Sequence, residues 1–244
     1  MGRCDVVWHR IRDRQVTIAS QAPHWHSTVV LLGCALALPL CAAAPFAALS
    51  IRVERNVSDQ DHEVVIEITS GSVGLATLKI VTPDGRTLLD LKAPDSKLGL
   101  RHLVIESPEP KSLATLHQEY PAGSYSFSGT TSAGVALTGT VMLEHQLPGP
   151  VRWLSPSTDN STATARGLSL RWVAAQGARS LALAIEDEKS GVKVLQVMLP
   201  ASTLRFSPPD GSLKPGTVYK ASIGAIGANG NASYVETTFT TARP

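Results

Sequence analysis

Short runs of alternating apolar and polar residues, separated by turn-forming residues, recur along the chain from about residue 50. Val64, Ile66 and Ile68 are spaced two apart, and so are Tyr125 and Phe127. A period of two puts alternate side chains on one face of a β-strand, whereas a helix repeats every 3.6 residues or so. The pattern therefore predicts an all-β protein made of two β-sandwich domains in tandem.

The first predicted sandwich spans residues 50–147. Within it, Thr82-Pro-Asp-Gly85 separates two apolar runs at residues 78–81 and 87–91. Proline presets the backbone of a turn, aspartate bonds to the nearby backbone, and glycine tolerates a positive φ. This segment therefore predicts a hairpin. Residues 111–119 are expected to form one or two turns of helix across the end of the sandwich.

Pro148-Gly149-Pro150 predicts the boundary to a second sandwich at residues 151–242, because proline lacks the N–H that a sheet ladder needs. The second segment holds seven short apolar runs, the number of strands in a seven-stranded sandwich. They fall within residues 151–155, 168–172, 181–185, 192–198, 204–206, 219–223 and 235–239.

An apolar run at residues 28–44 follows the basic stretch Arg10–Arg14 and ends in three alanines. Basic, apolar and small-residue regions in this order are typical of a secretory signal. We therefore interpret residues 1–44 as a signal peptide or leader, cleaved near residues 42–48. The protein is expected to be exported, to the periplasm or the extracellular space.

Two alternatives stay open for this leader. Residues 28–49 approach the length of about 20 residues that spans a bilayer, so the segment could remain as an uncleaved anchor. Leu31-Leu-Gly-Cys34 also resembles the lipobox of bacterial lipoproteins, in which the cysteine is acylated. An equally apolar run follows Cys34, although such a cysteine should open the mature chain.

Removing the leader changes both the cysteine content and the charge. All three cysteines lie in it, at Cys4, Cys34 and Cys41, so the remainder can form neither a disulfide nor a thiolate metal site. Of 22 basic and 20 acidic residues, four arginines and two aspartates lie in the leader, which leaves 18 of each. A nucleic-acid partner normally requires a basic stripe, and this balance argues against one.

Residues 213–219, Leu-Lys-Pro-Gly-Thr-Val-Tyr, resemble the corner that precedes strand F of fibronectin type III domains. Trp172 stands where that family has a buried strand B tryptophan. The resemblance covers about residues 150–242, and it implies a sandwich in which Leu213, Pro215 and Tyr219 form a structural corner. At such a corner the tyrosine ring is buried while its hydroxyl bonds to the backbone.

A fainter copy of this corner occurs in the first half. Residues 121–125, Pro-Ala-Gly-Ser-Tyr, align with residues 215–219 at an offset of 94 residues. Duplication and convergence on a proline-glycine-tyrosine corner both explain it. Residues 74–150 as a whole resemble an uncharacterised family of exported bacterial two-domain proteins, which implies architecture and compartment only.

Catalytic chemistry has little support in the sequence. Beyond the leader, His62, His102, His117 and His145 are not spaced as HxH or HExxH metal ligands. No GxSxG elbow, P-loop or GxGxxG occurs. The acidic run 58–63 has no glycine to shape a calcium loop, and we interpret it as solvated. No cofactor, metal site or catalytic residue is predicted.

Most aromatic residues belong to the predicted cores, but Trp153, Tyr120 and Tyr234 do not. They are our candidates for a ligand contact or for packing between the domains. The leading hypothesis is a non-enzymatic extracytoplasmic binding or scaffolding module, whose partner is another protein or a cell-surface polymer. A carbohydrate or cell-wall binding protein is the second, and an enzyme of unrecognised type is the third. The membrane would be contacted only through an uncleaved leader.

Overall fold

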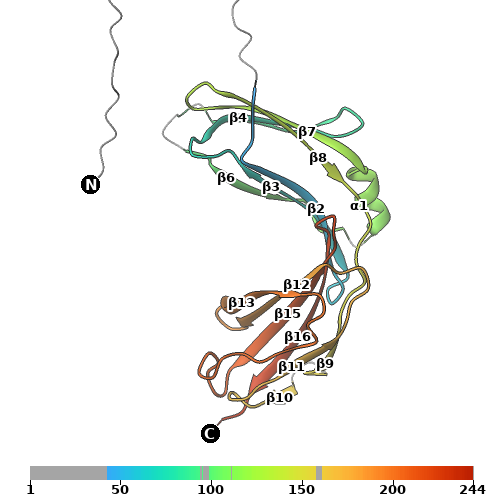
Figure 1. Ribbon diagram of the computed structural model, residues 1–244, viewed down its shortest axis with the longest axis vertical. Helices are drawn as coiled ribbons and strands as arrows, with labels where there is room; N and C mark the ends of the chain where they lie inside the picture. The colour runs from blue at the N-terminus through green and yellow to red at the C-terminus, as the bar shows by residue number, and fades with distance from the viewer. Residues whose placement is uncertain (1–42, 94, 96–98, 111, 158–160, 244) are drawn as a thin grey trace, which may run out of the picture. The chain divides into compact units, whose positions relative to one another are not determined.

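The computed structural model describes residues 43–243, except for residues 94, 96–98, 111 and 158–160 (Figure 1). The predicted leader thus lies outside the described residues, apart from its last two positions. The described chain is built from β-strands around two separate hydrophobic cores, with one short helix. This confirms the all-β class and the two sandwiches.

Eight strands build the first sandwich. One of its sheets has five strands in the order β1-β8-β7-β4-β5, and the facing layer is formed by β2, β3 and β6. The strands are β1 (Ala44–Pro45), β2 (Ala48–Asn56), β3 (Asp61–Thr69), β4 (Leu75–Val81), β5 (Thr87–Lys92), β6 (His102–Glu106), β7 (Gly123–Thr131) and β8 (Ala136–Leu143).

Residues before the expected start at residue 50 also contact this sandwich. Ala44 and Pro45 pair in parallel with Leu137 and Thr138 of β8. Phe46 is 8% exposed and packs in the first core. The period-two pattern did not reveal these contacts because the preceding residues are uniformly apolar.

The predicted hairpin joins β4 to β5. The Thr82 N–H donates to the Arg86 carbonyl at 2.9 Å, the Gly85 N–H donates to the Thr82 carbonyl at 3.0 Å, and Gly85 has a φ of +85°. The helix α1 covers Leu113–Glu119, and the Ser112 side chain caps it by accepting from the Thr115 N–H. Its Leu116 is fully buried in the first core.

The second sandwich has all seven predicted strands and one more. Three strands form one sheet in the order β14-β11-β9, and the other sheet contains β13-β12-β15-β16. The strands are β9 (Arg152–Ser155), β10 (Ser161–Ala163), β11 (Leu170–Val173), β12 (Ser180–Asp187), β13 (Val192–Pro200), β14 (Arg205–Phe206), β15 (Val218–Ile226) and β16 (Ala232–Thr241). The additional strand, β10, pairs in parallel with β16.

The corner residues take structural positions. Tyr219 is 1% exposed, and its hydroxyl accepts a hydrogen bond from the Lys214 N–H at 2.9 Å. Leu213 is buried in the same core, and Pro215 precedes Gly216, which has a φ of +65°. Trp172 is 1% exposed and its indole N–H donates to the Thr203 carbonyl at 2.8 Å. Both large polar side chains therefore bury their rings without losing a hydrogen bond.

The two sandwiches share a sheet. Ala232, Ser233 and Tyr234 of β16 pair in parallel with residues 54–56 of β2. The β13-β12-β15-β16 sheet of the second sandwich and the β2-β3-β6 layer of the first thereby form one eight-stranded sheet. Its order is β13-β12-β15-β16-β2-β3-β6, and β10 is the eighth strand, paired with β16. Sequence periodicity predicted the strands but not this junction.

Candidate functional site

A buried asparagine joins the two sandwiches. Asn231 is 1% exposed, and its side-chain carbonyl accepts from the Val53 N–H of β2 at 2.8 Å. Its amide donates to the carbonyls of Glu144 and Gln146 at 2.8 and 2.9 Å. One side chain thus bonds to the first sandwich and to the segment that connects the two, which fixes the chain at this point.

Ser233 adds a second set of junction contacts. Its buried hydroxyl donates to the Pro148 carbonyl at 2.7 Å and accepts from Arg55 of β2 at 3.1 Å. Nearby, the Val57 N–H donates to the Tyr234 carbonyl at 2.9 Å, and the Glu236 N–H donates to the Ser58 hydroxyl at 2.8 Å. The predicted boundary Pro148–Pro150 is therefore a bonded junction.

A groove lies at this junction, with a volume of about 440 Å³. Its floor is the outward face of the second sandwich's sheet, where the side chains are small: Ala182, Ala184 and Ser222. They stand on one face because Ala184 pairs with Ser222 across β12 and β15, and Ala182 lies two residues away. Small side chains leave room for a ligand to approach the sheet.

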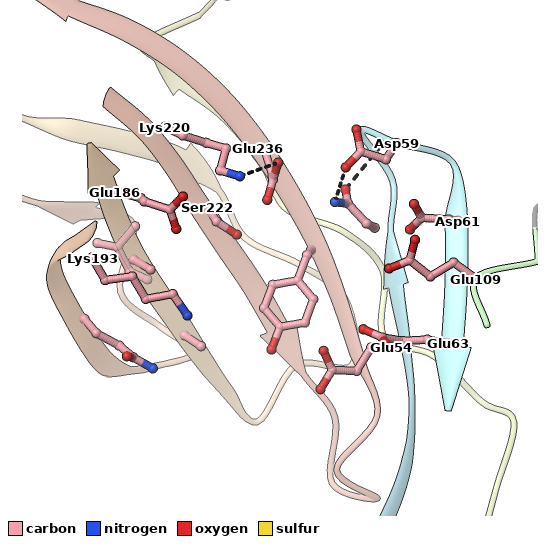
Figure 2. A pocket seen from close by; sticks show the side chains of 16 residues that line it. Glu54, Asp59, Asp61, Glu63, Glu109, Glu186, Lys193, Lys220, Ser222 and Glu236 are labelled. Carbon is pink, nitrogen blue, oxygen red and sulfur yellow. Dashed lines mark hydrogen bonds and ion pairs between the residues drawn. The ribbon is translucent and has the colours of Figure 1, made fainter. Parts of the chain in front are cut away.

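The two walls of the groove differ in charge. Figure 2 shows the carboxylates of the first sandwich on one side and a mixed set of second-sandwich residues on the other. The first wall is made of Glu54, Asp59, Asp61, Glu63 and Glu109. The second wall includes Lys193 and Lys220 beside Glu186 and Glu236, and Lys220 Nζ lies 3.8 Å from a Glu236 carboxylate oxygen.

Glu63 carries the clearest electrostatic signature of the acidic wall. Burial, together with the like charges of Glu54, Glu106 and Glu109, raises the pKa of Glu63 from 4.5 to about 7. On the opposite wall, burial also raises the pKa of Glu236, but Lys220 opposes that shift. Glu63 thus carries a charge that its surroundings disfavour, whereas Glu54 beside it pairs with Arg52 at 2.6 Å.

Tyr234 is the predicted candidate that lines the groove. It pairs with Gly224 of β15, and a side chain on Gly224 would meet the Tyr234 ring at 2.3 Å. Glycine at this position therefore lets the ring lie directly over the sheet. Burial raises the pKa of Tyr234 to about 12, so its hydroxyl keeps its proton at neutral pH.

The other two aromatic candidates lie elsewhere. Trp153 is 8% exposed and belongs to the second core, where its ring meets Trp172 edge-on with centroids 5.9 Å apart. It lies on strand β9, and its expected role in a ligand or interdomain contact stays a prediction. Tyr120 packs partly buried against the first core, at the end of α1. The three rings do not form one site.

One arrangement looks like a catalytic triad. The Thr69 hydroxyl lies 3.3 Å from His102 Nδ1, and His102 Nε2 lies 3.6 Å from a Glu67 carboxylate oxygen. Thr69 and His102 are directly opposed on β3 and β6, and Glu67 is two residues from Thr69 on the same face. His102 is 54% exposed at its side chain, so the trio is open to solvent. We interpret the trio as a solvated cross-strand ladder.

Two further histidines meet at the end of the first sandwich. The rings of His117 and His145 are stacked, with centroids 3.7 Å apart and planes 2° from parallel. Burial, with His145 and His62 nearby, lowers the pKa of His117. Across the described residues no group of three or more histidine, cysteine or acidic side chains is arranged to hold a metal ion. Nor does any helix in this part reach the length and apolarity needed to cross a membrane.

No known protein family and no curated protein matches the chain. Among solved structures it is similar to a two-domain fibronectin type III segment of chicken tenascin, with 10% identity, a TM-score of 0.30, and coverage of 79% of this chain and 94% of that one. The FN1–FN3 domains of chicken CNTN1 have 12% identity, a TM-score of 0.32, and coverage of 81% and 69%. The BSP domain of a biofilm-associated protein has 13% identity, a TM-score of 0.24, and coverage of 79% and 29%.

Proposed function

We propose that this chain is a non-enzymatic extracytoplasmic binding module that holds part of another protein, or of a cell-surface polymer, in the junction groove. The observation that carries the proposal is the groove itself, in which Tyr234 lies between a floor of small side chains and a wall of carboxylates. Ligand sites are concave and combine apolar surface with polar groups that fix the ligand's orientation. This groove places the Tyr234 ring and two alanines beside its charged side chains.

Binding fits the groove better than catalysis does. Its carboxylates line a surface open to solvent, whereas an acid–base pair must be held around a reacting bond in a pocket that limits water. A carbohydrate ligand would gain most from several stacked aromatic faces. Among the described residues that line the groove, Tyr234 is the one aromatic side chain. Trp153 lies in the second core instead of in the groove. We therefore favour a protein or peptide-like segment over a sugar.

Filling the groove tests this function. We expect Ser222→Phe to place a ring on the groove floor and to block the ligand, while the fold is kept because Ser222 points away from the core. Immobilised full-length chain would be exposed to envelope extract and, separately, to sedimented cell-wall material. The variant should lose at least about ten-fold of the binding seen with the unmodified chain.

Ser128→Phe is the matched control. Ser128 is exposed on β7, in the five-stranded sheet, and the substitution adds the same ring away from the groove. It should bind as the unmodified chain does. Equal binding by both variants, or no binding to either preparation, would contradict the proposal.

A further inference from the structure

Strand β13 forms one end of the eight-stranded sheet, and among the described strands it pairs with β12 alone. Its other edge carries backbone groups that can pair with a further strand. Three of its apolar side chains are exposed: Val192 at 57%, Val194 at 37% and Met198 at 59%. Solvent-exposed apolar residues of this size are more concentrated here than on any other described strand.

The middle of this strand lacks the features that usually protect an edge. Natural edges carry charges, prolines or bulges that prevent pairing with other chains. In β13, Lys193 and Pro200 lie near the two ends, and the ladder irregularity also lies near the Lys193 end. Residues 194–199, Val-Leu-Gln-Val-Met-Leu, contain neither a charge nor a proline. This composition favours pairing with another strand.

The strand is also complementary to itself. Two copies that run antiparallel overlap along all nine residues when the twofold axis passes through Gln196, the central position. This register opposes Val194 to Met198 of the second copy and Lys193 to Leu199. On the C-terminal side of the ladder irregularity, Leu195 of each copy opposes Val197 of the other, so these core-facing residues stay on one side of the extended sheet.

The charges in this register are compatible. The two Lys193 side chains lie six residues apart along the pair, about 20 Å, so they do not repel at close range. The two Gln196 amides meet at the axis, where each can donate to the other. Every remaining opposed pair brings apolar side chains together.

From this geometry we infer that β13 is a homodimerisation edge, on which a second copy of this chain adds its own β13 in the antiparallel register centred on Gln196. The contact is isologous, as in most homodimers, and it extends the eight-stranded sheet across the axis. A single strand pair buries little surface, so the dimer is weak and depends on concentration.

Light scattering coupled to size-exclusion chromatography tests the dimer on the full chain. The unmodified protein should approach twice the monomer mass as its concentration rises. Met198→Lys, which brings a charge to the paired edge, should raise the dissociation constant at least about ten-fold. Because Met198 is exposed, the thermal unfolding midpoint of the Met198→Lys variant should hardly change. Val104→Lys is the matched control, since Val104 is 50% exposed on β6 at the opposite end of the same sheet.

A cysteine pair tests the register. Gln196→Cys should form a disulfide-linked dimer above the background from the native cysteines, whereas Lys193→Cys, which would face Leu199, should not. A chain that is monomeric at every concentration overturns the inference. So does a Met198→Lys variant that dimerises as tightly as the Val104→Lys control. Ligand binding in the groove is measured separately, so either proposal can fail alone.

Discussion

The two sandwiches have corners of similar sequence, but one tyrosine hydroxyl accepts a hydrogen bond from the backbone and the other donates one to it. In the second, the Tyr219 hydroxyl accepts from the Lys214 N–H at 2.9 Å. In the first, the Tyr125 hydroxyl donates to the Pro121 carbonyl at 3.1 Å. Burial raises the pKa of Tyr125 to about 12, so this hydroxyl keeps the proton that it donates. A hydroxyl can do either, and the shared requirement is therefore a buried ring that reaches the backbone.

The groove walls give a second comparison between the sandwiches. The first sandwich contributes five carboxylates to the groove. The second contributes two lysines and two carboxylates. Formal charge over the whole chain beyond the leader is balanced, so this asymmetry arises from where the fold brings the side chains. Among the carboxylates of the first wall, burial and like charges raise the pKa of Glu63 to about 7. On the second wall, Glu236 has the ammonium group of Lys220 3.8 Å away.

The largest expected effect comes from separating the two sandwiches. Asn231→Ala removes a buried side chain that makes three hydrogen bonds and leaves the Val53 N–H and two carbonyls without this partner. Unfolding free energy should fall by about 3 kcal/mol, and urea unfolding should change from one transition toward two. Asn229→Ala, at a half-buried neighbour in the same turn, serves as the control because Asn229 also bonds to the Gln146 carbonyl but not to β2, and it should cost about 1 kcal/mol. A single unchanged transition in Asn231→Ala would show that the junction does not couple the two cores.

The corners are compared by removing each hydroxyl in turn. Tyr219→Phe and Tyr125→Phe keep the buried rings and delete one hydrogen bond each, so each should cost about 1 kcal/mol in urea unfolding. Because both bonds join a buried ring to nearby backbone at similar distances, the two losses should agree within about 0.5 kcal/mol. A loss confined to Tyr219 would mean that the first corner contributes no stability through its hydroxyl.

The smallest effect concerns the acidic wall and depends on pH. Glu63 has a raised pKa in the folded protein, so stability should fall as pH rises from 4.5 to about 7 and then level off. Glu63→Gln removes this loss and should stabilise the protein at pH 8 by about 1 kcal/mol, a value that allows for solvent screening of a partly exposed group. Thermal unfolding across this pH range measures it. Glu236→Gln should give a smaller gain, since Lys220 already stabilises the Glu236 carboxylate.

Local sequence patterns were sufficient for the strands and turns. Val64, Ile66 and Ile68 alternate because β3 has one face on the core, and Gly85 supplies the positive φ that the β4–β5 turn needs. Tyr219 could be recognised because its corner depends on residues within six positions. The burial of Trp153 could not be predicted, because the same residue can face a core or a ligand depending on the strand that contains it.

The candidate groove was predicted only in part. Tyr234 was singled out as an uncommitted ring, but the carboxylates of the acidic run 58–63 were interpreted as a solvated loop. Asp59, Asp61 and Glu63 line a groove opposite residues more than 100 positions away. No short-range pattern reports such a distance, although the density of acidic residues was a signal that could have drawn attention to the loop.

Residue order along the chain by itself determined that this protein is all-β, that it has two sandwiches, and where most strands and both tyrosine corners lie. These features depend on neighbours within a few residues, through side-chain periodicity and turn geometry. The tertiary structure alone decided that β16 pairs with β2, that Asn231 bonds both sandwiches, and that a groove with one acidic wall lies between them. Each of these depends on contacts between residues far apart in the chain, whose partners are selected by packing and by the pairing of buried backbone groups.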